Sequence, residues 1–171
     1  MTSAEHGRPT AAGPRILALS QSEPTSTRGL LESLLADILD ERRRGHEPAV
    51  CVTLDAAEAD DLPGDVRGFR EVLAGLVRAA FDAAVQPAPP SDVPPLCEVV
   101  VTSIDTGDAL EIEIADSGCA AGHDVLHAEA RAAARAFADR CGGSLSVAGC
   151  PEGGSAVTLR LPRRRAMSRA A

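Results

Sequence analysis

The chain has 171 residues, a mass of 17.6 kDa and a net charge of −8, which fit one acidic domain that can bury a core without disulfides or metals. This charge argues against binding nucleic acid through its phosphates, and three aromatic residues, all Phe, leave little surface for base stacking. No apolar stretch is long enough to cross a membrane. The five cysteines include no CxxC pair and are interpreted as reduced thiols of a cytoplasmic protein.

Composition divides the chain into three regions. Residues 1–14 are rich in Gly, Pro, Ala and Thr without periodicity, which predicts a disordered leader, and they lack the apolar core of a secretory signal. Residues 15–162 carry helical and strand patterns and are expected to form one domain. Pro162 stops the last strand, and residues 163–171 form a basic tail.

A helix is predicted near the start of the domain. Ser26 and Thr27 are suitable capping residues, and apolar residues recur at helical spacing between positions 30 and 39. The basic run 42–44 suits the carboxyl end of a helix, and Gly45 can terminate it. The apolar stripe has two alternative uses, as a core face or as a docking surface for a response regulator.

A strand and a second helix are expected next. Residues 49–54 have strand character. Asp65 can cap a helix that continues to about residue 84, with one apolar face. Five prolines between residues 86 and 95 exclude regular structure, so this segment is expected to be a surface loop.

The second half of the chain predicts two hairpins around a helix. Residues 98–104 and 110–116 flank a short turn, and the acidic residues that alternate with apolar ones indicate a half-buried antiparallel pair. An alanine-rich helix at about 124–140 precedes a hairpin of residues 144–148 and 155–161. The element order predicts an α+β fold, a two-layer α/β sandwich with a mixed, mostly antiparallel sheet and three main helices on one face.

Two stretches resemble nucleotide-binding motifs of a known family. The segment 64–73 and the helix that follows it resemble the helix bearing the asparagine box in the ATP-binding domain of sensor histidine kinases, a GHKL or Bergerat-fold module. Asp116-Ser117-Gly118, at the end of a strand, resembles the start of that family's Asp-x-Gly-x-Gly box. Their order along the chain matches that of the family.

The ends of the domain are also similar to this family. Residues 141–147, then Gly153-Gly154-Ser155 and the closing Leu161-Pro162, resemble its terminal glycine pair, hairpin and Leu-Pro. The helix of residues 26–44 resembles its opening helix. The likeness therefore covers residues 26–162, and it implies the fold already predicted from the element order.

The resemblance implies that the Mg²⁺ and phosphate sites are lost. The family asparagine that ligates the metal falls on Ala79 and a neighbouring one on Gly75, and neither offers an oxygen ligand. Glu71, two turns before Ala79, is either an acidic substitute or an exposed carboxylate. The glycines of the family's phosphate-binding helix N-terminus fall on Ala128 and Ala130, and the chain before them is too short for the family's lid.

The residues that remain are suited to adenine. By resemblance, Asp116 would accept a hydrogen bond from the adenine amino group, and Gly118 would let the backbone approach the base. Ala120 replaces the next family glycine, for which Gly122 could compensate, and Ser155 matches a family threonine beside the base. These candidate nucleotide-binding residues, Ala120 excepted, are also common in ordinary turns.

A separate group of side chains could bind a metal. Cys119, His123 and His127 are spaced by four residues, which would place them on one face if the segment is helical. No fourth ligand is evident, so no metal site is predicted.

These features favour a degenerate histidine-kinase-like ATPase domain of bacterial signal transduction that lacks Mg-ATP hydrolysis or phosphotransfer and acts through protein–protein interaction. The alternative is an active or weakly active ATP-binding kinase or ATPase with a rearranged site using Glu71 and Gly122. No catalytic residue or cofactor is assigned, and only weak ATP or ADP binding is left open. The expected partner is a response regulator, a kinase dimerisation domain or a second copy, with no nucleic acid and no membrane.

Overall fold

The computed structural model describes residues 24–57, 62–86, 97–118, 128–150 and 153–163. Within these ranges the helices and strands follow the predicted order. They are α1 (Thr27–Arg44), β1 (Cys51–Ala56), α2 (Val66–Ala84), β2 (Glu98–Asp105), β3 (Ala109–Asp116), α4 (Ala128–Cys141), β4 (Ser144–Gly149) and β5 (Ser155–Pro162).

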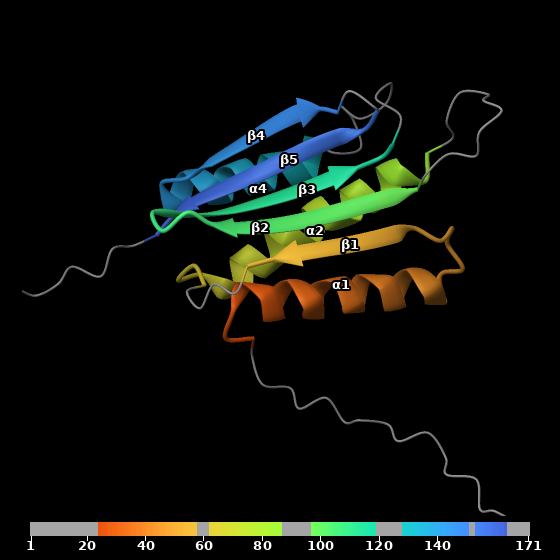
Figure 1. The fold of residues 1–171 in the computed structure, drawn as a ribbon, viewed down its shortest axis with the longest axis horizontal. Helices are drawn as coiled ribbons and strands as arrows, with labels where there is room; N and C mark the ends of the chain where they lie inside the picture. Colours follow the sequence, from red (N-terminus) through yellow and green to blue (C-terminus); the bar gives the residue numbers. More distant parts are fainter. Residues whose placement is uncertain (1–23, 58–61, 87–96, 119–127, 151–152, 164–171) are drawn as a thin grey trace, which may run out of the picture.

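The five strands form one mixed sheet in the order β1-β2-β3-β5-β4. Strand β1 pairs parallel with β2 because α2 crosses over between them, and every other pair is antiparallel. Figure 1 shows α1, α2 and α4 gathered on one side of the sheet, with α1 beside the β1 edge and α4 behind β4 and β5. The two-layer α+β class predicted from the sequence is confirmed.

The core lies between the helices and the inner face of the sheet. All three Phe residues of the chain are buried there, and the rings of Phe69 in α2 and Phe137 in α4 stack with centroids 6.0 Å apart. The stripe of α1 also belongs to this core, because Leu30, Leu34 and Ile38 are each at most 3% exposed. The alternative use of this stripe as a docking surface is therefore wrong, since its apolar side chains are already packed against α2 and the sheet.

Local capping explains where the helices begin. Ser26 Oγ accepts a hydrogen bond from the Gly29 amide at 3.1 Å, and Asp65 Oδ1 accepts one from the Gly68 amide at 2.9 Å. Helix α4 is followed by Gly142 in the left-handed conformation (φ +72°), as the Gly-Gly pair predicts. The part of the predicted third helix before Ala128 lies outside the described residues.

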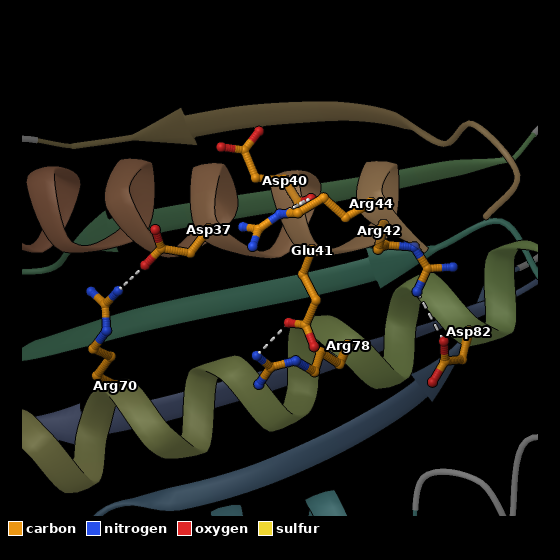
Figure 2. A network of polar contacts seen from close by, with 8 residues as sticks. All are labelled: Asp37, Asp40, Glu41, Arg42, Arg44, Arg70, Arg78 and Asp82. Atoms are coloured by element: carbon orange, nitrogen blue, oxygen red, sulfur yellow. Dashed lines mark hydrogen bonds and ion pairs between the residues drawn. The ribbon is translucent and has the colours of Figure 1, made fainter. Parts of the chain in front are cut away.

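Ion pairs join the exposed sides of α1 and α2 (Figure 2). Arg70 binds Asp37 at 2.6 Å, Arg78 binds Glu41 at 2.9 Å, and Arg42 of α1 binds Asp82 of α2 at 3.0 Å. Residue numbers increase together along the two helices, so α1 and α2 run parallel. The basic end of α1 is thus used within the fold, as the helix-terminus interpretation predicts.

The first residue after the predicted domain end contacts the domain. Arg163, assigned to the tail, donates its backbone amide to Asp108 O at 2.8 Å and forms an ion pair with Asp105 at 2.7 Å. These contacts tie it to the β2–β3 turn. The leader, residues 1–14, and the tail beyond Arg163 lie outside the described residues.

Candidate functional site

The candidate site begins with a buried carboxylate at the end of β3. Inward-facing residues of this strand are apolar at Leu110, Ile112 and Ile114, and the same alternation places Asp116 on the helix-covered face. Asp116 is 6% exposed. Its Oδ1 accepts a 2.9 Å hydrogen bond from the Gly118 amide, and its Oδ2 accepts a 2.8 Å hydrogen bond from Ser155 Oγ. Three of the four predicted site residues therefore come together.

The sheet register explains this meeting of residues far apart in sequence. Strand β5 pairs antiparallel with β3, and Ser155 lies directly opposite Asp116. Along β5, Ser155 continues the inward row formed by Val157 and Leu159, so its hydroxyl points to the same face as the carboxylate. A carboxylate has about four lone-pair positions, so Asp116 retains capacity for another donor such as an amino group.

Glycines let the backbone close around Asp116. A Cβ placed on Gly118 would lie 2.5 Å from the carbonyl oxygen of Ala83 in α2. Gly154 has φ +84°, and a Cβ there would collide with the carbonyl oxygen of Asp116. The side chain of Ser117 fixes the same strand end, because its Oγ accepts the Glu98 amide at 2.8 Å. The sheet terminus, the carboxylate and the end of α2 are therefore held in one arrangement.

The face of α2 beside this site carries small residues. Ala79 and Ala83 are 7% and 1% exposed, and a Cβ added to Gly75 would lie 3.8 Å from the Cβ of Ala130 in α4. Of these, Ala79 and Gly75 are the positions at which the resemblance expects oxygen ligands for Mg²⁺. Alanine and glycine side chains supply no oxygen, so this stretch of α2 does not fit the metal.

Glu71 lies on a different part of α2. Its side chain is 65% exposed and forms an ion pair with Arg67, one turn earlier, at 3.0 Å. The carboxylate is therefore engaged at the helix surface. Among the described residues, no group of His, Cys, Asp and Glu side chains is arranged to hold a metal ion.

Some predicted positions cannot be placed. Gly122, proposed to compensate for the missing glycine, lies outside the described residues, and so do the three residues of the candidate metal set, Cys119, His123 and His127. Ala128 and Ala130, which the resemblance aligns with the family's phosphate-binding glycines, belong to the first turn of α4 as described. The four cysteines that are described are free thiols.

The sequence reasoning missed the hydrogen bonds within the site. The resemblance places Ser155 beside a bound base, and the structure adds that its hydroxyl donates to Asp116. The resemblance includes Gly154 only as part of the family-like hairpin, and the structure shows that this glycine allows the backbone to approach Asp116. The sequence did contain a signal for this contact. On both β3 and β5, a polar residue stands at the end of a row of inward-facing apolar residues.

Solved structures of histidine-kinase catalytic domains share this fold. The nucleotide-free catalytic domain of histidine kinase ThkA matches with a TM-score of 0.61 at 14% sequence identity, over 79% of this chain and 92% of that one. Histidine kinase AdeS of Acinetobacter baumannii matches with a TM-score of 0.57 at 15% identity, over 82% of this chain and 66% of that one. No family model and no curated protein sequence matches the chain. The chain therefore has the fold of histidine-kinase catalytic domains.

The length and hydropathy of the described helices can be compared with those of a membrane-spanning helix. None of them is both long enough and apolar enough to span a bilayer.

Proposed function

We propose that this chain is a degenerate histidine-kinase-like ATPase domain that acts in bacterial signal transduction by binding a protein partner, without Mg-ATP hydrolysis or phosphotransfer. The proposal rests on the histidine-kinase fold together with one local observation. By the resemblance, Ala79 and Gly75 fall at the metal-binding positions of the family, and a Cβ on Gly75 would lie 3.8 Å from the Cβ of Ala130 in α4. Phosphoryl transfer depends almost entirely on metal and charge positioning, so a site without these ligands is not expected to support it.

The triphosphate and the adenine ring of a nucleotide are expected to bind this site to different extents. The triphosphate would need Mg²⁺, and α2 offers no side-chain oxygen at the relevant positions. The adenine ring would need an acceptor for its amino group, which Asp116 can provide, and a close backbone, which Gly118 permits. Weak, metal-independent binding of ATP or ADP is consistent with this division.

Calorimetry separates these cases. The chain is titrated with ATP and with ADP, each with and without Mg²⁺, and phosphate release is followed in parallel. We expect no gain in affinity on adding Mg²⁺ and no phosphate release above a blank. Micromolar binding that requires Mg²⁺ would defeat the proposal.

The alternative function is a weakly active ATPase or kinase with a rearranged site. The observation that favours it is the preserved set of Asp116, Ser155 and Gly118, bonded to one another at the sheet end. This alternative predicts slow phosphate release that disappears in Asp116→Asn, because the amide cannot accept from adenine in the same way. Equal release by the variant and the wild-type chain would point to a contaminating activity.

The proposed partner is a response regulator, a kinase dimerisation domain or a second copy of this chain, and the proposed location is the cytoplasm. Support for a protein partner comes from the retained fold combined with the missing metal ligands. Light scattering on the purified chain measures self-association, and titration with a response regulator or a dimerisation domain tests the other two partners. A monomer that binds neither would contradict this part of the proposal.

A further inference from the structure

A cavity of about 560 Å³ lies at the opposite end of the sheet from Asp116. Leu110, at its wall, is six residues from Asp116 along β3, which corresponds to about 20 Å of strand. The cavity is bounded by the segment entering α2, the end of α4 and the paired ends of β3 and β5. It is therefore separate from the candidate nucleotide site.

The walls of this cavity are mostly apolar. Leu110, Phe137 and Leu161 come from the buried core, and Leu62, Pro63 and Pro162 add apolar surface. Its volume falls in the range of small-molecule sites, which usually combine apolar walls with a few polar groups.

One charged group in the wall has no charged partner among the residues that the structure describes. The Arg140 guanidinium lies 5.4 Å from the Phe137 ring centroid, and its only hydrogen bond given by the described residues is to Ala136 O, at 3.3 Å. No carboxylate within the described ranges forms an ion pair with it. The other charged residues are engaged, because Asp65 accepts the Gly68 amide and Arg163 pairs with Asp105.

We propose that this cavity binds a small apolar carboxylate. The apolar body would lie against Leu62, Pro63 and Pro162, and the carboxylate would meet Arg140, whose planar fork suits this group. The amino end of α2, which also borders the cavity, is already capped by the Asp65 carboxylate, so Arg140 is the group that would select the anion. The tail after Arg163 is a poor occupant, because its arginines at 164, 165 and 169 have the same charge as Arg140.

Cys141 offers a direct readout of occupancy. It lies in the cavity wall and is a partly buried free thiol, whereas Cys51 is an exposed thiol on the distant β1 edge. The rate of alkylation of each cysteine by iodoacetamide is measured by peptide mass spectrometry with octanoate, 1-octanol or octylamine present. Cys51 serves as the internal reference for effects on the reagent.

We expect octanoate to slow alkylation of Cys141 roughly tenfold at ten times its dissociation constant, with Cys51 unchanged. Octylamine should give no protection, and octanol only weak protection. Arg140→Gln should weaken octanoate binding by about tenfold, since a charge-assisted hydrogen bond is lost. Arg135→Gln, on an exposed part of α4 outside the cavity, is the matched control and should behave as wild type.

Two results would overturn the proposal. If millimolar octanoate leaves Cys141 as reactive as before, the cavity does not take this class of ligand. If octanoate and octanol protect equally, and Arg140→Gln changes neither, the arginine does not select an anion. Either result leaves the proposed signalling function untouched, because ATP, Mg²⁺ and the partner are absent from the assay.

Discussion

Ser155 lies opposite Asp116 in the β3–β5 pair and donates its hydroxyl to Asp116 Oδ2 at 2.8 Å. Both residues are 6% exposed and extend inward rows that are otherwise apolar. A buried carboxylate without enough donors is costly, so the serine and the Gly118 amide together make this arrangement tolerable. The site is consequently part of the fold as well as a candidate nucleotide contact.

Ser155→Ala should destabilise the chain by about 1–3 kcal/mol, because it leaves one oxygen of a buried carboxylate without its donor. Urea unfolding measures the change. Ser146→Ala, at an exposed position on the neighbouring strand β4, is the matched control and should change stability by less than about 0.5 kcal/mol. Equal effects from the two variants would mean that the hydrogen bond to Asp116 contributes nothing special.

Gly154→Ala should destabilise the folded chain more than an alanine substitution at another glycine of the same hairpin. Gly154 has φ +84°, and a Cβ would collide with the backbone of Asp116, so a loss of at least about 1–3 kcal/mol is expected. Gly149→Ala is the control, since a Cβ there meets open space. Thermal unfolding of the two variants tests the difference, and a Gly154 variant as stable as the Gly149 variant would refute the close approach.

The fold was predictable because periodicity and capping agree in each element. Ser26 and Asp65 mark helix starts that the structure places one residue later, and the alternation in β3 correctly gives its inner and outer faces. Which strands pair with one another was harder to predict from the sequence. That β1 lies parallel to β2, with Cys51 beside Glu98, depends on the crossover through α2, which no local pattern specifies.

The residues of the candidate site could be predicted from the sequence, but the hydrogen bonds between them could be predicted only in part. Asp116 and Gly118 are close in sequence, so a local turn already relates them. Ser155 is 39 residues away, and its contact with Asp116 follows from the β3–β5 register. Burial of the α1 stripe was likewise open, because an amphipathic helix looks the same in sequence whether it faces a core or a partner.

Arg42 is expected to matter more than the other arginines at the end of α1. Its side chain is 11% exposed, forms ion pairs with Asp82 and Glu47, and lies 5.0 Å over the Phe81 ring. Arg42→Gln should cost about 1–3 kcal/mol, from lost charged hydrogen bonds and packing. Arg43→Gln removes an exposed pair with Asp40 within one helix and should cost less than about 0.5 kcal/mol. Urea unfolding of both variants tests the ranking, and equal losses would contradict it.

The contribution of Glu41 to the stability of the folded chain should decrease as the pH falls. Its hydrogen bond to Arg78, with the charge of that guanidinium, lowers the pKa of Glu41 below its usual 4.5. A carboxyl with a lowered folded-state pKa stabilises the protein above the unfolded-state pKa, and this contribution is lost as pH falls through the folded-state value. The effect is small, since both side chains are at least half exposed.

The comparison that isolates this effect is the difference in urea midpoint between the wild-type chain and Glu41→Gln as a function of pH. The wild type should be more stable near neutrality, and the difference should shrink as the pH falls below about 4.5. Added salt should reduce the difference, because exposed ion pairs are screened. Glu32→Gln, which removes a carboxylate paired with Arg28 inside α1, controls for the loss of one negative charge from this helix. A difference that stays constant between neutral and acidic pH would contradict this prediction, because it would show that the contribution of Glu41 does not depend on the charge of its carboxylate.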